Sequence, residues 1–146
     1  PLAWTPLARQ RLAIGLPADH RLAGSTAPLR LRSVAEDPFI AMLPGYGTRL
    51  LLDSLADAAG FRPRLVFESM ELTTVAGLVS AGLGVALLPI DDPFLSVTGI
   101  VLRPIAPAAH RELGMIRRRA ADLTPPVAAL HDDILALAGS GRWSRQ

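Results

Sequence analysis

The fold is decided by the stretch Val75-Ala76-Gly77-Leu78-Val79-Ser80-Ala81-Gly82-Leu83-Gly84-Val85-Ala86-Leu87-Leu88-Pro89. Between residues 71 and 81, apolar residues recur three and four positions apart and a glycine follows, which is typical of an amphipathic helix and its end. Residues 84–89 are then apolar without interruption, as in a strand that is covered on both faces of a parallel sheet. We therefore predict a helix over residues 71–81 and a buried strand over residues 84–89.

The alternation of helices and strands continues toward the N-terminus. The runs at residues 11–16, 39–43 and 64–67 are predicted to be strands, because they are short, rich in apolar residues and bounded by proline or glycine. Thr48 is suited to cap a helix, and apolar residues then recur at helical spacing until Gly60. Strands that alternate with helices in this way indicate an α/β layer structure with a mostly parallel sheet.

Two more strands and one helix are predicted toward the C-terminus. Residues 100–105 and 112–117 have the composition of strands. Pro125 stands where the first turn of a helix accepts proline, and apolar residues then recur at helical spacing. The last segment, residues 139–146, is predicted to be a polar tail.

The charge of the chain argues against a nucleic-acid-binding surface. All 15 basic residues are arginine, and 13 acidic residues reduce the formal net charge to +2. The arginines are dispersed except at residues 117–119, which we interpret as a solvated strand end, whereas a DNA-binding surface would carry a denser basic stripe.

Other features of the composition exclude several classes of protein. There is no cysteine, which excludes disulfides and thiolate metal sites. No apolar run reaches the roughly 20 residues needed to cross a bilayer, so we expect a soluble protein with no membrane partner. The first residues lack the charged and apolar regions of a secretory signal, and the missing initiator methionine suggests a partial chain.

No catalytic constellation stands out in the sequence. The histidines His20, His110 and His131 are far apart and in unlike contexts, so we interpret them as solvated or structural and expect no metal site. Glu68 and Glu71 could converge where a strand passes into a helix, but the helix dipole also favours a glutamate at a helix start. Neither a Gly-x-Ser-x-Gly nor a His-Glu-x-x-His motif is present, and no cofactor is expected.

The turn Gly45-Tyr46-Gly47-Thr48-Arg49 leads into a predicted helix. Such a turn exposes backbone N–H groups that can hold an anion, to which Tyr46 adds a stacking face and Arg49 a charge. It lacks the Gly-Lys-Ser/Thr ending of a P-loop, so it does not support nucleotide binding. An anion site and a plain tight turn both remain open at this point.

Several segments, in order along most of the chain, resemble the effector-binding domain of LysR-type bacterial transcription regulators. Residues 6–23 are similar to the hinge strand and the Pro-x-x-His-Pro-Leu-Ala stretch of that family, with Arg21 in place of the usual proline. Asp37-Pro38-Phe39-Ile40 resembles its next strand, and Gly60-Phe61-Arg62-Pro63 resembles its Gly-Phe-x-Pro link. The stretch at residues 75–89 is the most specific signature among them.

The resemblance implies a type 2 periplasmic-binding-protein-like α/β fold with two Rossmann-like lobes. Residues 1–11 would be a linker or hinge approach, residues 12–95 the second lobe, residues 96–138 the returning portion of the first lobe, and residues 139–146 the tail. The opening half of the first lobe and the winged helix-turn-helix have no counterpart here. The chain alone is therefore not expected to bind an operator, and DNA is a partner only through that absent domain.

Effector contacts carried over from the family fall on the ends of two strands and on the helix starts that follow. These positions are Ala41, Met42, Tyr46, Gly47, Thr48, Ser69, Met70 and Glu71. Open α/β sheets place ligands at such ends. Met42, Tyr46 and Met70 would form an adaptable wall, while Thr48, Ser69 and backbone N–H groups could hold a carboxylate.

Contacts between copies carried over from the family fall on the helix at residues 50–59 and the strand at residues 64–67. These positions are Leu50, Leu51, Ser54, Leu55, Ala58, Arg64 and Val66. The helix has apolar residues on more than one face, more than core burial alone requires. A homodimer or a tetramer is therefore expected.

The function that the resemblance implies is that of a cytoplasmic ligand-sensing domain. It would bind a small organic-acid or aromatic effector between two lobes and would not be an enzyme. A solute-binding receptor of the same fold is the alternative, which a signal peptide would favour and an upstream winged-helix sequence would exclude. An enzyme on this fold is a third alternative, and it would need a catalytic dyad that the sequence does not contain.

Overall fold

A computed structural model describes residues 2–118 and 123–141 of the chain. They form two compact units. The larger unit contains residues 11–90 and 94–111, and the smaller unit contains the described parts of residues 1–10, 91–93 and 112–146. Within the described residues, no helix is long and apolar enough to span a membrane.

Parallel and antiparallel strand pairs build the larger unit. β2 (Pro38–Met42) and β3 (Arg64–Ser69) are parallel, and a parallel bridge joins Phe39 of β2 to Val85 just before β4 (Ala86–Pro89). The last part of β1 (Leu2–Pro17) pairs antiparallel with both β4 and β5 (Ile100–Pro104). The expected parallel arrangement thus holds for β2, β3 and β4, whereas β1 runs against its neighbours.

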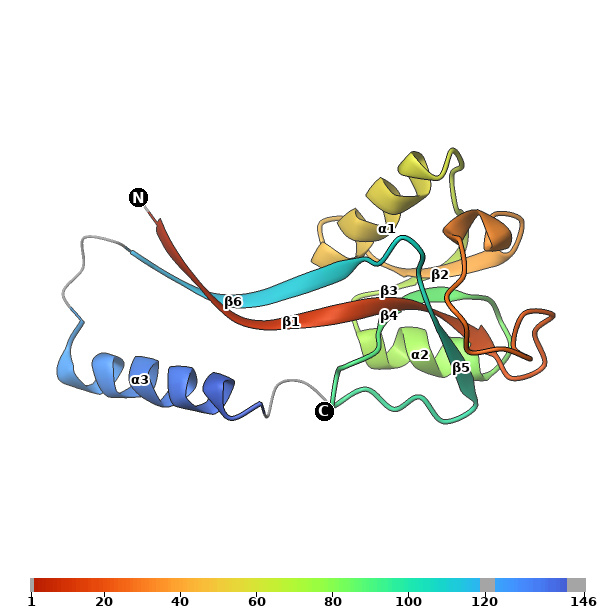
Figure 1. Ribbon diagram of the computed structural model, residues 1–146. Coiled ribbons are helices and arrows are strands. Elements are labelled where there is room, and N and C mark those ends of the chain that lie inside the picture. The colour runs from red at the N-terminus through yellow and green to blue at the C-terminus, as the bar shows by residue number, and fades with distance from the viewer. Residues whose placement is uncertain (1, 119–122, 142–146) are drawn as a thin grey trace. The chain divides into compact units, whose positions relative to one another are not determined.

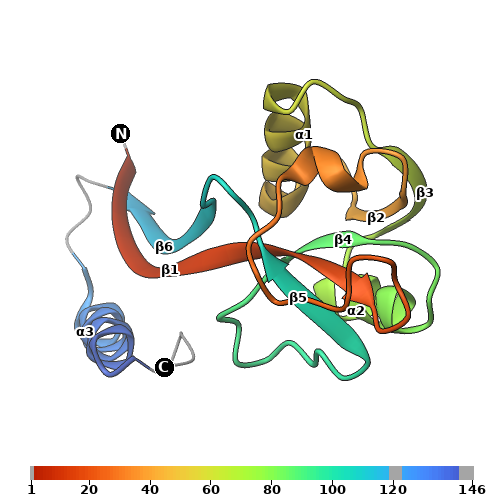
Figure 2. The ribbon, with the colours of Figure 1, turned by 45° about the vertical axis from the view of Figure 1, so that its right-hand side comes forward.

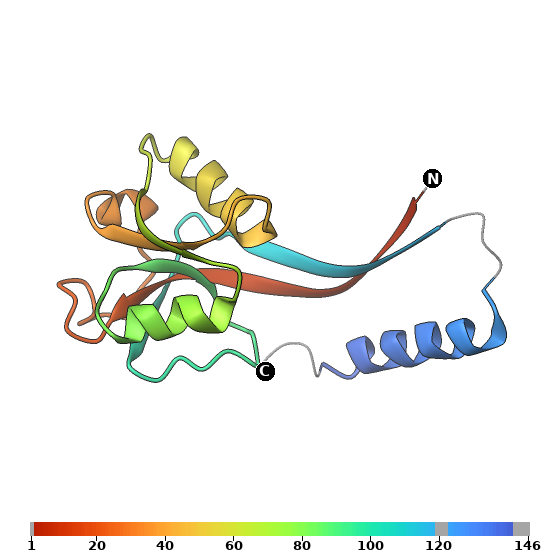
Figure 3. The same cartoon turned by 180° about the vertical axis from the view of Figure 1, so that it is seen from behind.

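Helices α1 (Gly47–Ala58) and α2 (Leu72–Ser80) cover opposite faces of these strands (Figures 1 and 3). Successive residues of β2 point to opposite faces of a sheet. Accordingly, Phe39 packs in the core cluster that contains Leu52 of α1, whereas Ile40 packs in the cluster of α2. Both side chains are fully buried. Neighbouring side chains of one short strand therefore pack against helices on opposite faces.

The short helix η1 (Leu31–Val34) lies on the same side of the sheet as α1 (Figure 2). It buries Leu31 and Val34 and precedes β2. β5 pairs with residues 13–17 of β1 and therefore belongs to the larger unit. The assignment of residues 96–138 to a returning portion of the first lobe stays a prediction.

In the smaller unit, the first part of β1 pairs with β6 (His110–Arg118). The ring of Trp4 lies so close to Gly114 that a Cβ atom there would be 2.3 Å from its Cζ2 atom. β1 begins at Leu2, so the strand prediction for residues 11–16 was too short. Helix α3 (Pro125–Gly139) is present as predicted, but it buries none of its residues.

Candidate functional site

Two strand-to-helix junctions lie side by side at one end of the larger unit. The last residues of β2 and β3, Met42 and Ser69, are partners in the parallel ladder, and the Leu43 N–H donates to the Ser69 carbonyl at 2.9 Å. α1 starts at Gly47, five positions after the first of these strand ends, and α2 starts at Leu72, three positions after the second. We call these strand ends, the turns and the helix starts (residues 41–48 and 69–72) the carboxyl edge.

The first junction is a turn with an uncapped helix start. Gly45 has a φ of +93°, a left-handed conformation that favours glycine. Tyr46, not Thr48 as predicted, is the N-cap of α1, and no side chain caps the helix. Thr48 lies in the first helical turn instead. The N–H groups of that turn therefore have no side-chain acceptor within the described chain.

The second junction repeats this arrangement. Glu71 is the N-cap of α2 with an extended backbone, and no side chain caps that helix either. The Ser69 hydroxyl oxygen accepts a hydrogen bond from the Glu71 N–H at 3.1 Å. This contact leaves the hydroxyl proton of Ser69 available to donate, because the oxygen acts in it only as acceptor.

The predicted effector residues divide into an exposed and a buried group. Tyr46, Gly47, Met70 and Glu71 are exposed, and Thr48 and Ser69 are half-buried at the same edge. Ala41 and Met42 are only 3% and 8% exposed and pack in the core beneath that edge. The exposed face of the carboxyl edge is therefore formed by the turns and the helix starts.

Arg49 joins the elements of the carboxyl edge. Its guanidinium group donates to the carbonyl of Met42 at 3.1 Å, to the carboxylate of Asp53 at 3.0 and 3.1 Å, and to the carboxylate of Glu68. Burial alone would lower the pKa of Arg49, but the hydrogen bonds and charges of Glu68 and Asp53 raise it above the ordinary arginine value. Arg49 is thus a permanent cation that ties α1 to the ends of β2 and β3.

These contacts correct two expectations about charged groups. Arg49 is paired with two carboxylates, so its charge is not free to hold an anion as the turn motif suggested. Glu68 is paired with Arg49 and not with Glu71. The spacing of four residues between Arg49 and Asp53 is a helical ion-pair signal that could have identified the pairing. The contact with Glu68 spans 19 positions and left no such signal.

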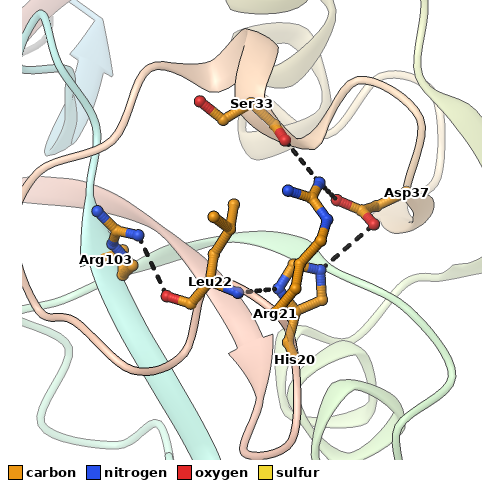
Figure 4. A network of polar contacts seen from close by, with 6 residues as sticks. All are labelled: His20, Arg21, Leu22, Ser33, Asp37 and Arg103. Atoms are coloured by element: carbon orange, nitrogen blue, oxygen red, sulfur yellow. Dashed lines mark hydrogen bonds and ion pairs between the residues drawn. The ribbon is translucent and has the colours of Figure 1, made fainter.

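A second polar network fixes the loop after β1 (Figure 4). Arg21 donates to the Asp37 carboxylate at 2.8 Å and to the Ser33 carbonyl at 2.7 Å. His20 Nδ1 accepts the Leu22 N–H at 3.2 Å, so a neutral His20 carries its proton on Nε2. That atom lies 3.3 Å from Asp37 Oδ1 but makes no hydrogen bond of good geometry. The network gives His20 a structural role, as its sequence context suggested.

Replacing Asp37 by asparagine is expected to lower the free energy of unfolding by about 1 kcal/mol, because the charge that faces Arg21 and His20 is lost. Asp37 is 17% exposed at its side chain, whereas Arg21 is 54% exposed, which limits the effect. Urea unfolding at neutral pH measures the change. The control is Asp19→Asn, at an exposed carboxylate of the same loop. Equal stability of the two variants would show that the network does not hold the loop.

Most of the positions predicted to contact a second copy are exposed. Leu50 is 60% exposed and Val66 is 38% exposed. Ser54, Ala58 and Arg64 are also exposed, and Leu51 and Leu55 are half-buried. Among the described strands, β3 pairs only with β2, so its other edge is open. Exposed apolar residues on a helix and an open strand edge are each suited to contact another protein surface.

Comparison with known proteins identifies one family over almost the whole chain. The family model described as LysR substrate binding domain matches residues 1–138. The HTH-type transcriptional regulator YybE of Bacillus subtilis is 39% identical over 89 residues, which are 61% of this chain and 30% of that protein. The dual regulator GltC of the same species is 30% identical over 123 residues, with coverage of 82% and 40%. The chain spans 30–40% of the length of these relatives.

Solved structures show the same fold. The effector-binding domain of QuiR in complex with shikimate has a TM-score of 0.82 at 23% identity, and the match covers 95% of this chain and 66% of that one. The C-terminal domain of a probable LysR family regulator from Rhodococcus sp. RHA1 has a TM-score of 0.78 at 28% identity, with coverage of 91% and 67%. The regulatory domain of CcmR from Synechocystis in complex with 2-PG has a TM-score of 0.81 at 18% identity, with coverage of 94% and 67%. These neighbours confirm the predicted type 2 periplasmic-binding-protein-like fold class.

Proposed function

The chain belongs to the LysR substrate binding domain family, and from this premise we propose that it senses a small organic-acid or aromatic effector for a bacterial transcription regulator. The observation that carries the proposal is the register of Met42 with Ser69. It places two uncapped helix starts beside each other at the carboxyl edge. Because a helix N-terminus has a partial positive charge and unpaired N–H groups, two of them together favour an anion.

The remaining groups at the carboxyl edge suit an organic acid better than an inorganic ion. The hydroxyl groups of Thr48 and Ser69 can donate to a carboxylate, and Tyr46 and Met70, which are 40% and 58% exposed, offer apolar surface to its carbon skeleton. The ligands in the QuiR and CcmR complexes, shikimate and 2-PG, support an effector of this class. On this proposal the carboxyl edge is one wall of the effector site.

In the whole regulator, the effector would alter the populations of two arrangements of the lobes, which the attached DNA-binding domains would read. DNA binding then belongs to a helix-turn-helix domain outside this chain, as the HTH-type regulators among its relatives suggest. The exposed positions on α1 and β3 would serve assembly into a homodimer or tetramer in the cytoplasm. The family is one of transcription regulators, which favours a sensor over a solute-binding receptor or an enzyme.

A thermal-shift screen of the two-lobe domain against small organic acids, aromatic compounds and amino acids tests the proposal. An effector at 100 times its Kd is expected to raise Tm by about 5 °C or more, since binding to the folded state stabilises it by about 2.7 kcal/mol. The double variant Thr48→Ala/Ser69→Ala should lose most of this shift.

The matched control is Thr26→Ala/Ser33→Ala, which removes two exposed hydroxyl groups away from the carboxyl edge. It should keep the shift. If the Thr48→Ala/Ser69→Ala variant responds to the effector as the wild type does, the carboxyl edge is not the effector site.

A further inference from the structure

A cavity of about 560 Å³ lies in the larger unit on the side of the sheet that α1 covers. It is formed by the last turns of α1, by η1 and by the segment after β5, and its apolar walls include Leu31, Leu55 and Ile105. No residue of the carboxyl edge lines it. From the start of α1 at that edge to Ala58 at the cavity, the rise of 1.5 Å per residue amounts to roughly 15 Å. The cavity is therefore separate from the proposed effector site.

Among the residues that the structure describes, the charged groups that line this cavity are two arginines, and none of its lining residues has a carboxylate. In Leu29-Arg30-Leu31-Arg32, the leucines are 5% and 4% exposed and both arginines are exposed. The alternation thus anchors the segment in the core and leaves the two guanidinium groups outside it. The Arg30 carbonyl accepts the N–H of Ser33 at 2.9 Å, but the Arg30 side chain makes no hydrogen bond or ion pair with the described part of the chain.

Arg32 is held in place by the end of α1. Its Nη1 donates to the carbonyl of Ala59 at 3.1 Å and to the carbonyl of Gly60 at 2.8 Å, which are acceptors that a helix C-terminus leaves without partners. The Nε and Nη2 donors of Arg32 have no acceptor among the described residues. A guanidinium that is fixed at one nitrogen and free at the others is ready to bind a carboxylate.

We propose that this cavity is a second ligand site, which takes a small organic anion with an apolar body, of the class of arylalkyl carboxylates. The apolar body covers Leu31, Leu55 and Ile105, and the carboxylate accepts from Arg30 and Arg32. The cavity volume is within the range of small-molecule sites, which are mostly apolar with a few polar groups that fix orientation. An uncharged ligand of the same shape leaves the Arg30 guanidinium and the free Nε and Nη2 donors of Arg32 without an anionic acceptor, and a small inorganic anion leaves the apolar walls in water.

Occupation of this cavity acts on α1. Arg32 binds the carbonyl groups of the two residues that follow α1. Leu55 and Ala58 line the cavity and are also among the positions proposed for assembly. A ligand held by Arg32 therefore contacts the helix that joins the carboxyl edge to those positions. The second site would report on a different small molecule from the one sensed at the carboxyl edge.

Isothermal titration of the whole chain with phenylacetate tests the proposal, with phenylacetamide and acetate as matched probes. Phenylacetate is expected to bind with one saturable site, and each of the other two probes at least about tenfold more weakly, because one lacks the charge and the other the apolar body. Arg30→Gln should raise the Kd of phenylacetate about tenfold. It should leave Tm without ligand unchanged, since the Arg30 side chain has no hydrogen bond or ion pair with the described residues to lose. Ala58→Leu places a larger side chain of α1 in the cavity and should abolish the saturable binding of phenylacetate.

The outcomes separate this site from others. Thr48→Ala/Ser69→Ala should bind phenylacetate as the wild type does, and if that variant loses binding while Arg30→Gln keeps it, the anion sits at the carboxyl edge and the second site is refuted. Equal affinity for phenylacetate and phenylacetamide would also refute it. If the cavity is instead filled by a second copy, phenylacetate does not bind, and Ala58→Leu changes the sedimentation coefficient.

Discussion

Replacing Gly84 by alanine is expected to lower the free energy of unfolding by about 3 kcal/mol, because the added methyl group has no room. A Cβ atom at Gly84 would lie 2.6 Å from the Pro38 carbonyl oxygen and 3.2 Å from Ile40 Cγ1. The same carbonyl accepts the N–H of Val85 at 2.8 Å, and the Ile40 N–H donates to Val85 at 2.9 Å. The methyl group therefore pushes β4 away from β2, where these two bonds join the parallel strands.

Urea unfolding of Gly84→Ala and Gly77→Ala measures this effect against a matched control. Gly77 is exposed on α2, and nothing lies within 4 Å of a Cβ atom placed there. Gly77→Ala should raise the free energy of unfolding by about 0.5–1 kcal/mol, since alanine is the better helix former. If Gly84→Ala is as stable as the wild type, the close approach of β4 to β2 is not a constraint on the fold.

Gly84 also shows how far the sequence predicts the fold. The pattern at residues 75–89 is local, since helical spacing, a glycine and an apolar run occur within one segment, and the helix and strand were predicted from it. The reason for glycine at position 84 is the carbonyl of Pro38, which is 46 positions away in the chain. Local periodicity contains no information about such an approach, so only the structure explains this residue.

Local sequence also could not predict the direction and length of β1. Its residues 13–17 pair with β5 and its residues 12–15 pair with β4, both antiparallel. An alternating segment looks alike whether its neighbours run with it or against it, and proline is disfavoured inside a strand because it has no N–H to donate. The structure places Pro6 within β1 all the same. Pairing with distant segments decided this element, whereas α1 and α2 followed from local spacing.

The carboxyl edge was predictable as a structural feature but not in its details, and its role as the effector site stays a proposal. Strand ends followed by helix starts identified the carboxyl edge, and the ladder partners Met42 and Ser69 support that location. The burial of Met42 depends on its contacts with α2, and the N-cap at Tyr46 in place of Thr48 depends on the left-handed turn at Gly45. Propensities rank threonine above tyrosine as an N-cap, so the turn geometry overrode the propensity.

The charge balance at the carboxyl edge leads to the second large expected effect, on the Kd of the effector. Glu68→Gln should lower the Kd for an organic-acid effector about tenfold, and Arg49→Gln should raise it about tenfold. Removing the Glu68 carboxylate leaves Arg49 with one carboxylate partner fewer, and removing the Arg49 cation leaves Glu68 and Asp53 unneutralised. A unit charge roughly 10 Å from the ligand changes the binding free energy by about 1.5 kcal/mol at an effective dielectric constant of about 20.

Isothermal titration with the organic acid that gives the largest thermal shift measures both Kd values, at a temperature where circular dichroism shows each variant folded. The control is Glu36→Gln, which removes an exposed carboxylate before β2 and should leave the Kd within about twofold of the wild type. A loss of structure at the edge would weaken binding in both variants, whereas electrostatics at an anion site moves them in opposite directions. Opposite changes of the two Kd values, which would then differ about a hundredfold, therefore identify an anion at the carboxyl edge. A change of both Kd values in the same direction would place the effector elsewhere.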